Sequence, residues 1–292
     1  MLFVRYDGGM NNETYDDLHP LDIPYMGAGI DVPDTYELYL HVPGVSEMVR
    51  IHHVTSDTHI GHRNIAKYTG RPYVNDENTD DMDADLVRLW NEVVAPGENV
   101  LHLGDAALGQ ISESIKWYGK MNGNKFLVPG NHDYISSVST QSRRERYAEV
   151  YAGYFTVLPE TVTVIANKGK QKRTMRACHY PSIADPREGG KYQSLRPPAG
   201  DGVPLIHGHT HYKEVLNPMA PYEFHAGIDA HGLKPVSAYA ISEWAFSLPA
   251  PEDGILNEVW GLTPMGPEIR DELLKMARQE GLIERPRFDW KG

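Results

Sequence analysis

Three histidines alternate within five residues in the stretch LIHGHTHYK, at positions His207, His209 and His211. A short apolar run precedes them, which is typical of a β-strand that ends there. Imidazole nitrogens grouped in this way can bind a divalent metal ion, and a bound ion can activate water for hydrolysis. A solvated loop could carry the same spacing, so the rest of the chain must decide between the two interpretations.

Four other short apolar runs also stop at a small residue and then at polar side chains. Each run is rich in Val, Ile or Leu and indicates a β-strand. Oxygen and imidazole donors suit divalent Mn, Fe or Zn, and five such strand ends in one chain indicate a metal site, although each alone is typical of a turn. The polar side chains at the five ends are Asp57 and His59, Asp105, Asn131 and His132, His179, and His209 and His211.

The elements that would position these side chains alternate along the chain. Helical patterns lie at 79–94, 111–121 and 142–155, and the first has Thr79 as its N-cap and acidic residues in its first turn. Residues 160–180 indicate a hairpin. Strands that alternate with helices and are followed by hairpins predict an α/β sandwich, in which functional groups collect beyond the carboxyl ends of the strands.

The local sequence around the candidate ligands carries a geometric signal. In extended backbone, residues two apart point the same way, so Asp57 with His59, and His209 with His211, are each expected to present a paired face. Because glycine has no Cβ, it lets the backbone turn sharply beside a crowded site. A glycine directly precedes three of the candidate ligands, at positions 104, 130 and 208.

The bulk composition excludes several classes of protein. The formal net charge of −12 argues against non-specific binding to duplex nucleic acid, which depends on Lys and Arg. The single cysteine, Cys178, excludes an internal disulfide and a Cys-rich zinc site. No apolar run approaches the ~20 residues that span a bilayer, and no secretory signal is visible. We therefore expect a cytoplasmic protein that does not contact a membrane. The composition leaves open whether the chain forms a homo-oligomer.

The chain divides into three parts by composition. Residues 1–49 are rich in Asp, Gly, Pro and Tyr, contain one strand pattern at 36–42, and are expected to form an extension packed on or near the main domain. Residues 50–248 contain all five strand ends and are expected to form a catalytic domain. Residues 249–292 are expected to form a linker and an amphipathic helix over 267–281.

Five motif blocks carry a family resemblance that extends over residues 50 to 245. The blocks are SDTH at 56, LGDA at 103, GNHD at 130, CHYP at 178 and GHTH at 208. In this order they resemble the signature of the calcineurin-like metallophosphoesterase superfamily, and the stretches DTHIGHRNI and GIDAHGLKPVS resemble a compact branch found in bacteria and phages. The resemblance implies an α/β fold of the metallophosphoesterase type, a four-layer sandwich of two mixed β-sheets flanked by helices.

The same resemblance implies a dinuclear metal centre that acts on a small phosphoester substrate. Mn is the expected metal, with Fe, Zn or Ni as alternatives. Asp105 would bridge the two ions, since a carboxylate can span two cations and a neutral imidazole cannot. The other ligands would be Asp57, His59 and His211 for the first ion, and Asn131, His179 and His209 for the second.

The resemblance further implies how the site would act on its substrate. A hydroxide that bridges the ions would attack phosphorus, and His132 would protonate the leaving group, which typically contributes about 10²–10⁴-fold to the rate. Asn131 and His62 are candidates for contact with the substrate, although an exposed loop histidine is the alternative for His62. Arg71 could pair with a phosphate or form a salt bridge, and His207 could support the site or act as a ligand.

The motifs differ from those of serine/threonine protein phosphatases in the same superfamily. Their second block reads G-D-x-x-D-R-G, whereas this chain reads GDAALGQ, without the second Asp and the Arg. The missing Arg would grip a phosphomonoester dianion, so its absence favours a phosphodiesterase that acts on small phosphodiesters such as cyclic nucleotides. The alternatives are a phosphomonoesterase, a nuclease of short strands, and a scaffold that binds metal without catalysis.

Overall fold

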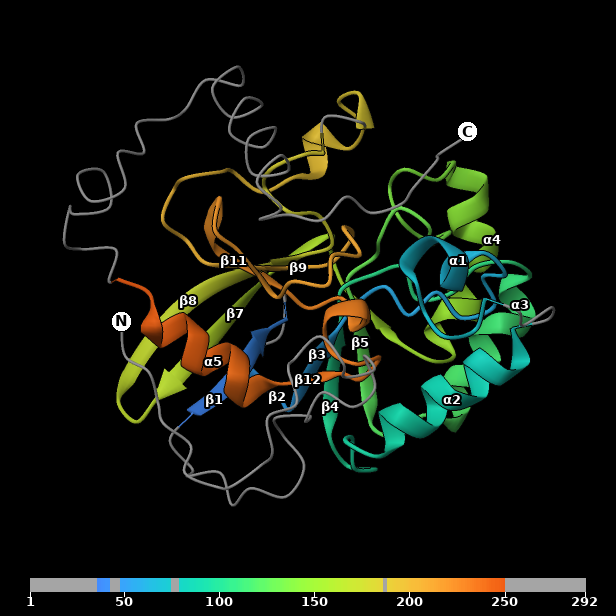
Figure 1. The fold of residues 1–292 in the computed structure, drawn as a ribbon, viewed down its shortest axis with the longest axis horizontal. Helices are drawn as coiled ribbons and strands as arrows, with labels where there is room; N and C mark the ends of the chain where they lie inside the picture. The colour runs from blue at the N-terminus through green and yellow to red at the C-terminus, as the bar shows by residue number, and fades with distance from the viewer. Residues whose placement is uncertain (1–35, 43–47, 75–78, 186–187, 250–292) are drawn as a thin grey trace, which may run out of the picture.

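The computed structural model describes residues 36–42, 48–74, 79–185 and 188–249, which form two β-sheets flanked by helices (Figure 1). The strands of the larger sheet are β1 (Tyr36–His41), β2 (Met48–Ile51), β7 (Thr161–Lys168), β8 (Gln171–Cys178), β9 (Leu205–His207), β10 (Leu216–Asn217) and β11 (Ala220–His225). Those of the smaller sheet are β3 (His53–Thr55), β4 (Asn99–His102), β5 (Asn124–Leu127), β6 (Thr156–Val157) and β12 (Val236–Ser237).

Both sheets mix parallel and antiparallel strands, as predicted. The larger sheet has the order β10-β11-β9-β8-β7-β1-β2, and its neighbours β8 and β9 are parallel. The smaller sheet has the order β12-β3-β4-β5-β6, and β3, β4 and β5 are parallel neighbours. Parallel neighbours end at the same edge of a sheet. The loops after β3, β4 and β5, and those after β8 and β9, therefore start side by side.

Helices pack on the smaller sheet and along the larger one. Helix α2 begins after Thr79, with Asp80, Asp81 and Asp83 in its first turn, where acidic side chains favour the helix dipole. None of the described helices has both the length and the apolar character needed to cross a membrane. The α-helices are α1 (Ile65–Thr69), α2 (Asp80–Asn91), α3 (Ile111–Ser114), α4 (Gln141–Ala152) and α5 (Ala238–Ser247), and the 3-10 helices are η2 (Ile115–Lys120), η4 (Gln193–Leu195) and η5 (Ile228–Ala230).

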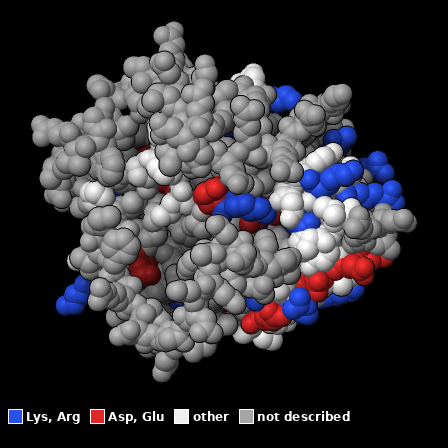
Figure 2. All heavy atoms as spheres, viewed as in Figure 1, with Lys and Arg blue, Asp and Glu red and all other residues white. Residues whose placement is uncertain are grey.

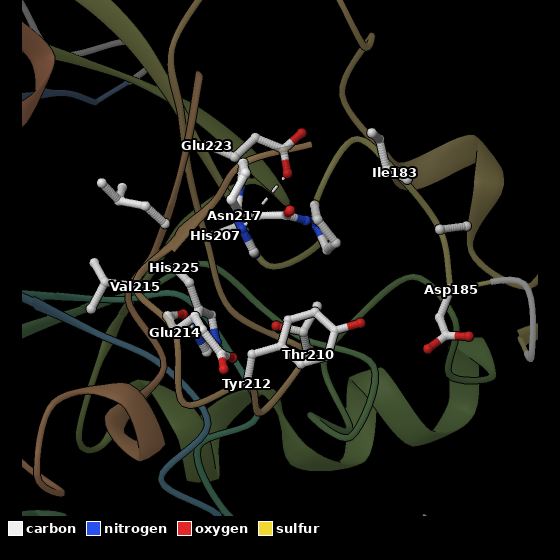
Figure 3. Close-up of a pocket in the computed structure, with 14 residues that line it drawn as sticks. Ile183, Asp185, His207, Thr210, Tyr212, Glu214, Val215, Asn217, Glu223 and His225 are labelled. Carbon is white, nitrogen blue, oxygen red and sulfur yellow. Dashed lines mark hydrogen bonds and ion pairs between the residues drawn. The ribbon is translucent and has the colours of Figure 1, made fainter. Parts of the chain in front are cut away.

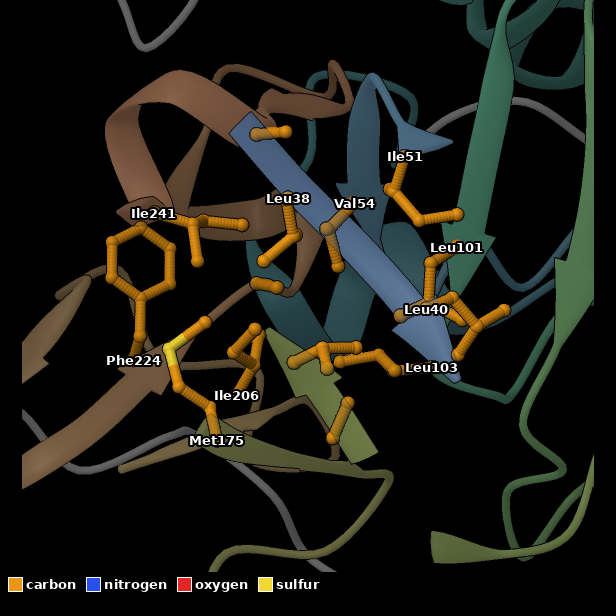
Figure 4. Packing of buried hydrophobic residues seen from close by; sticks show 14 of the residues in the cluster. Leu38, Leu40, Ile51, Val54, Leu101, Leu103, Met175, Ile206, Phe224 and Ile241 are labelled. Atoms are coloured by element: carbon orange, nitrogen blue, oxygen red, sulfur yellow. The ribbon is translucent and has the colours of Figure 1, made fainter. Parts of the chain in front are cut away.

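Two hydrophobic cores hold these layers together. The first lies between the sheets, where Leu38, Val54 and Leu101 are fully buried and Ile241 of α5 joins them (Figure 4). The second core joins the smaller sheet to the helices and contains large buried side chains such as Trp90. Burial of this apolar surface fixes the strands, and hence fixes where the loops at their ends begin.

Strand β1 lies inside the larger sheet, between β2 and β7. Its residues Leu38 and Leu40 are 0% exposed, so the strand predicted at 36–42 is part of the central core. The larger sheet therefore begins before the predicted boundary at residue 50. Most of the predicted extension and the helix predicted over 267–281 lie outside the described residues.

Candidate metal centre

Five of the predicted ligands have left-handed backbone just beyond the ends of strands. The φ angle is 60° at Asp57, 50° at His59, 54° at Asp105, 73° at His209 and 53° at His211. Such a conformation costs a non-glycine residue about 1–3 kcal/mol, and strain of this kind gathers at functional sites. These residues follow the ends of β3, β4 and β9. Tight turns, and not the predicted alternation of an extended strand, therefore bring the paired side chains together.

Glycines beside the ligands let the loops approach each other closely, as predicted. A Cβ on Gly104 would lie 2.4 Å from the backbone nitrogen of Gly130, and a Cβ on Gly208 would lie 2.4 Å from Oδ2 of Asp57. Real Cβ atoms do not come within 3.0 Å of other heavy atoms, so a side chain at either position would push the loops apart. The φ angle of 95° at Gly104 also requires glycine.

Asp57, His59 and His211 form the first group of candidate ligands, whose donor atoms all lie within 4.8 Å of one another. Oδ1 of Asp57 is 4.0 Å from Nε2 of His59 and 3.8 Å from Nε2 of His211. Among the described residues, neither Oδ1 of Asp57 nor Nε2 of His59 has a hydrogen-bond partner, although both are buried. A buried polar atom without a hydrogen-bond partner costs free energy, and a cation bound to both atoms would satisfy them.

His179 is the centre of the second group. Its Nδ1 lies 2.7 Å from the carbonyl oxygen of Leu103, and because a carbonyl only accepts, Nδ1 carries the proton. Its Nε2 therefore has a free lone pair, and lies 3.1 Å from Oδ1 of Asn131 and 3.2 Å from Nδ1 of His209. In the neutral ring of His209 the proton is on Nε2, which donates to Glu188 over 3.0 Å. Three lone pairs thus face one another, an arrangement that a cation would stabilise.

Oδ2 of Asp105 lies between the two groups. It is 3.5 Å from Nε2 of His59 in the first group and 3.5 Å from Nε2 of His179 in the second. Oδ1 of Asp105 accepts a 2.8 Å hydrogen bond from the backbone N–H of His132, which fixes the carboxylate. Ligands that share an ion at bond lengths of about 2.0–2.2 Å are themselves about 3–3.5 Å apart, so this spacing fits a shared oxygen. All seven predicted ligands are thus close together.

Burial lowers the pKa of His59 and His179, two of the imidazoles of the site, whereas the contacts of His211 with Asp229 and Asp57 outweigh its burial and raise its pKa. The pKa of His59 lies well below its usual value, first because the ring is buried and then because His211 and His132 are close. A neutral imidazole has the lone pair that a metal ligand needs. The donor set of carboxylate, amide oxygen and neutral imidazole therefore fits two divalent cations of the Mn, Fe or Zn type.

The rings of His132 and His62 both lie close to His59 of the first group. The ring centroid of His59 is 5.4 Å from that of His132 and 5.3 Å from that of His62. Nε2 of His132 is 4.0 Å from Oδ2 of Asp105, and its side chain is 24% exposed, so it can contact a substrate. Burial, followed by the nearby charges of His132 and Arg71, lowers the pKa of His62 to about 4. At neutral pH His62 can therefore form hydrogen bonds but carries no charge.

Arg71 forms a buried salt bridge. Its Nε and Nη2 donate to the two oxygens of Asp229 over 2.8 and 3.0 Å, and Nη1 and Nη2 donate to the backbone carbonyls of Thr58 and Asp57. Its side chain is 0% exposed. The geometry thus favours the salt-bridge alternative over phosphate binding, and we leave Arg71 out of the substrate site.

His207 belongs to neither group of ligands. Its Nδ1 donates to the carbonyl oxygen of Gly208 over 2.8 Å, and its Nε2 lies 3.7 Å from Oε2 of Glu223 on β11. Burial is the main reason why the pKa of His207 falls to about 4. The neutral ring supports the turn at Gly208, which agrees with the supporting role and not with the role of a ligand.

A pocket lies beside the GHTH loop and shares Thr210 with it (Figure 3). Oγ1 of Thr210 and Nε2 of His225 are buried without a hydrogen-bond partner among the described residues. The described side chains that line the pocket include carboxylates but no Lys or Arg. A pocket with apolar walls and a few polar groups is typical of a ligand site. Its other lining residues include Ile183, Asp185, His207, Tyr212, Glu214, Val215 and Glu223.

Asp133 organises the loops, although the sequence suggested no role for it. Its Oδ2 accepts from the backbone N–H groups of Asp105 and Gly130, each over 2.8 Å, and its Oδ1 accepts from that of Ala106 over 3.1 Å. Burial and then the Asp105 carboxylate raise the pKa of Asp133 to about 7, while the backbone donors favour its ionised form. Its place at the end of the GNHD block was the signal that could have revealed it.

Two further carboxylates that the sequence did not reveal contact candidate ligands. Asp229 accepts from Nδ1 of His211 over 2.8 Å, and Glu188 accepts from Nε2 of His209 over 3.0 Å. The ring of a ligand histidine is oriented by a carboxylate that accepts a hydrogen bond from the nitrogen that does not bind the metal. Asp229 lies in the GIDAHG stretch that contributed to the resemblance, whereas Glu188 lies in no motif.

The surface beside His132 is basic despite the net charge of −12. Figure 2 shows Lys and Arg side chains gathered over α1 and α4, with acidic side chains along α2. On α4, Arg143 and Arg146 are exposed, and the guanidinium of Arg143 lies 4.8 Å from the centre of the Tyr134 ring. Tyr134 follows His132 by two residues, so this positive surface starts close to the site.

Several known proteins are similar to this chain. The chain is 28% identical to the Gene 66 protein of Mycobacterium phage L5 over 61% of its length and 86% of that protein, and 28% identical to the Gene 66 protein of Mycobacterium phage D29 over 62% and 90%. It is 35% identical to the uncharacterized protein MJ1445 of Methanocaldococcus jannaschii over 28% of this chain and 46% of that one. The crystal structure of the protein of unknown function AQ665 from Aquifex aeolicus aligns with a TM-score of 0.43 and 20% identity, over 65% of this chain and 97% of that chain.

The family assignment rests on a longer match. Residues 53–213, more than half of the chain, match the profile of the calcineurin-like phosphoesterases. This segment contains all five motif blocks, and the structure brings Asp and His side chains from four of them into two overlapping groups that could each hold a metal ion, Asp57 with His59 and His211, and Asp57 with Asp105 and His179. The chain therefore belongs to the calcineurin-like phosphoesterase family and is a metal-dependent phosphoester hydrolase.

Proposed function

We propose that the chain is a phosphodiesterase that hydrolyses small phosphodiesters, such as cyclic nucleotides, at a centre that holds two divalent ions. The observation that carries the proposal is the position of Asp105, whose Oδ2 lies 3.5 Å from a ligand nitrogen of each group. Asp57, His59 and His211 would hold the first ion. The second ion would be held by Asn131, His179 and His209, and Asp105 would be shared.

The residues around the ions would act on the ester in distinct ways. When bound, two divalent ions lower the pKa of a water molecule and offset the charge that grows on the phosphoryl oxygens. His132 would protonate the leaving oxygen, because its ring is exposed and lies next to Asp105. Neutral His62 and the amide of Asn131 would donate hydrogen bonds to the ester oxygens.

The charge of the site supports a diester over a monoester. At neutral pH a monoester carries about one negative charge more than a diester. Arg71 is held by Asp229, and the pocket beside the GHTH loop is lined by carboxylates and by no described Lys or Arg. This pocket would instead hold an uncharged organic part of the diester.

A comparison of two chromogenic esters tests the proposal. Metal-depleted protein would be assayed with Mn, Zn, Ni or Mg against bis-p-nitrophenyl phosphate and p-nitrophenyl phosphate. We expect metal-dependent turnover that is faster on the diester. A strong preference for the monoester would replace the proposal with a phosphomonoesterase, and two bound ions without any turnover would indicate a scaffold.

A nuclease of short single strands is the second candidate, and the basic surface on α4 favours it. Arg143 stacks on Tyr134, whose ring centroid lies 4.9 Å from that of Tyr147. Arginine and aromatic side chains together are typical of single-strand binding surfaces. Cleavage of a labelled single-stranded oligonucleotide, weakened in Arg143→Ala but unchanged for cyclic nucleotides, would support this candidate.

A further inference from the structure

His211 is held by a buried carboxylate and arginine. Its Nδ1 donates to Oδ2 of Asp229 over 2.8 Å, and Nε of Arg71 donates to Oδ1 of Asp229 over 2.8 Å. The side chains of Asp229 and Arg71 are both 0% exposed. This chain of contacts therefore fixes His211 in a part of the protein from which water is excluded.

His209 is held by a second pair of the same kind, on a different segment. Its Nε2 donates to Oε1 of Glu188 over 3.0 Å, and Arg196 forms an ion pair with Oε2 of Glu188. Arg196 also donates to the carbonyl oxygens of Pro181 and Ile183 over 2.9 and 3.4 Å, which ties together the segment that crosses from β8 to β9. The position of Glu188 thus depends on how this segment is folded.

The two carboxylates select opposite nitrogens of the two rings. Asp229 accepts a hydrogen bond from Nδ1 of His211, so in the neutral ring the free lone pair is on Nε2, which lies 3.8 Å from Oδ1 of Asp57. Glu188 accepts a hydrogen bond from Nε2 of His209, so in the neutral ring the lone pair is on Nδ1, which lies 3.2 Å from Nε2 of His179. Each carboxylate therefore orients one histidine toward one ion site.

The second pair is more accessible than the first. The Glu188 side chain is 20% exposed, whereas that of Asp229 is 0% exposed. The second ion site also has less negative charge of its own, because none of Asn131, His179 and His209 is a carboxylate and Asp105 is shared between the two sites. Any change in the orientation of His209 should therefore alter the affinity of this site more than the affinity of the first.

The geometry points to Glu188 as a positioning residue that sets the affinity of the second metal ion through His209. This inference rests on the ligand sets of the proposed function. Loss of a carboxylate that orients a ligand histidine typically weakens metal binding by about 10–100-fold. The effect should fall mainly on the second ion, because His211, one of the two histidines of the first ion, has its own partner in Asp229.

The test measures metal binding and does not depend on activity. Metal-depleted wild type, Glu188→Ala and Glu188→Gln would be titrated with Mn²⁺ by calorimetry, with paramagnetic resonance to detect coupled ion pairs. We expect the Kd of the second ion to rise about 10–100-fold in Glu188→Ala. Glu188→Gln should lose less, because its amide oxygen can still accept. Asp201→Asn is the matched control, since Asp201 lies on the same segment and pairs with Arg176 instead.

The outcomes separate this inference from the proposed function. Unchanged binding of both ions in Glu188→Ala would overturn the role of Glu188, provided that His209→Ala loses the second ion. Full binding of two ions by His209→Ala would overturn the ligand set itself. An equal loss of both ions in Glu188→Ala, together with a lower Tm of the metal-free protein, would show that Glu188 only stabilises the fold.

Discussion

The backbone N–H of Asp105 donates a 2.8 Å hydrogen bond to Oδ2 of Asp133, which joins the loop after β4 to the loop after β5. Gly130 and Ala106 donate to the same carboxylate. Asp133 is 0% exposed, so water could not replace its carboxylate as the acceptor for these backbone N–H groups. The position of Asp105 between the two groups therefore depends on a neighbour that would touch neither metal ion.

Replacement of Asp133 by Asn should destabilise the site. An amide has one acceptor oxygen, and its NH₂ group would face at least one backbone N–H that now donates to the carboxylate. A buried donor left without a partner costs about 1–3 kcal/mol. We expect a lower Tm of the metal-loaded protein and weaker binding of both ions, measured by calorimetry and metal analysis. An unchanged Tm with two bound ions would refute the role of Asp133.

His132→Ala should keep both metal ions and lose turnover. A general acid contributes about 10²–10⁴-fold, and it matters less when the leaving group is already a weak base. The loss should therefore be larger for a cyclic nucleotide, which leaves as an alkoxide, than for bis-p-nitrophenyl phosphate. An equal loss on both esters, or a loss of metal, would contradict the assigned role.

Gly208→Ala should weaken metal binding. The new Cβ would lie 2.0 Å from Oγ of Ser56 and 2.4 Å from Oδ2 of Asp57, so the loop that carries His209 must move away. Gly97→Ala is the control, because nothing lies within 4 Å of its Cβ position. Metal content after dialysis would be compared for the two variants. Equal retention of both ions would mean that the loop adapts without cost to the site.

Arg71→Met distinguishes a structural arginine from a phosphate ligand. The substitution would leave Asp229 charged, buried and without its main partner, which typically costs about 3–5 kcal/mol. We expect a large fall in Tm, whereas Lys116→Met on the surface should change little because Lys116 pairs with exposed Glu113. A stable Arg71→Met protein with a raised KM for the diester would restore the phosphate-binding interpretation.

The gathering of these Asp, Asn and His side chains in one place could be predicted, because such residue types are rare together at the ends of strands. Their geometry could not, since the paired residues Asp57 and His59 converge through left-handed turns and not through strand alternation. The contacts of Glu188 could not be predicted either, and the only signal for those of Asp133 was its place in the GNHD block. Each depends on which backbone or ring nitrogen donates a hydrogen bond to the carboxylate in the folded protein. The donor and the acceptor of these bonds are not separated by a fixed number of residues along the chain.

The fold was predictable where local patterns and tertiary packing agree. Helix α2 begins after Thr79 as predicted, because its apolar face and its acidic first turn favour the same boundaries. Strand β1 was recognised as a strand, but its place between β2 and β7 is set by the pairing of Leu38 and Leu40 with residues more than a hundred positions away. Such non-local pairing leaves no periodic signal in one sequence.

The most direct test of the central claim is a titration of metal-depleted protein with Mn²⁺, in which bound ions and diester hydrolysis are measured in the same samples. We predict two ions per chain, turnover that rises as the second ion binds, and loss of both ions and turnover in Asp105→Asn. Two ions in Asp105→Asn with full turnover, or a single ion in an active wild type, would contradict a dinuclear centre bridged by Asp105.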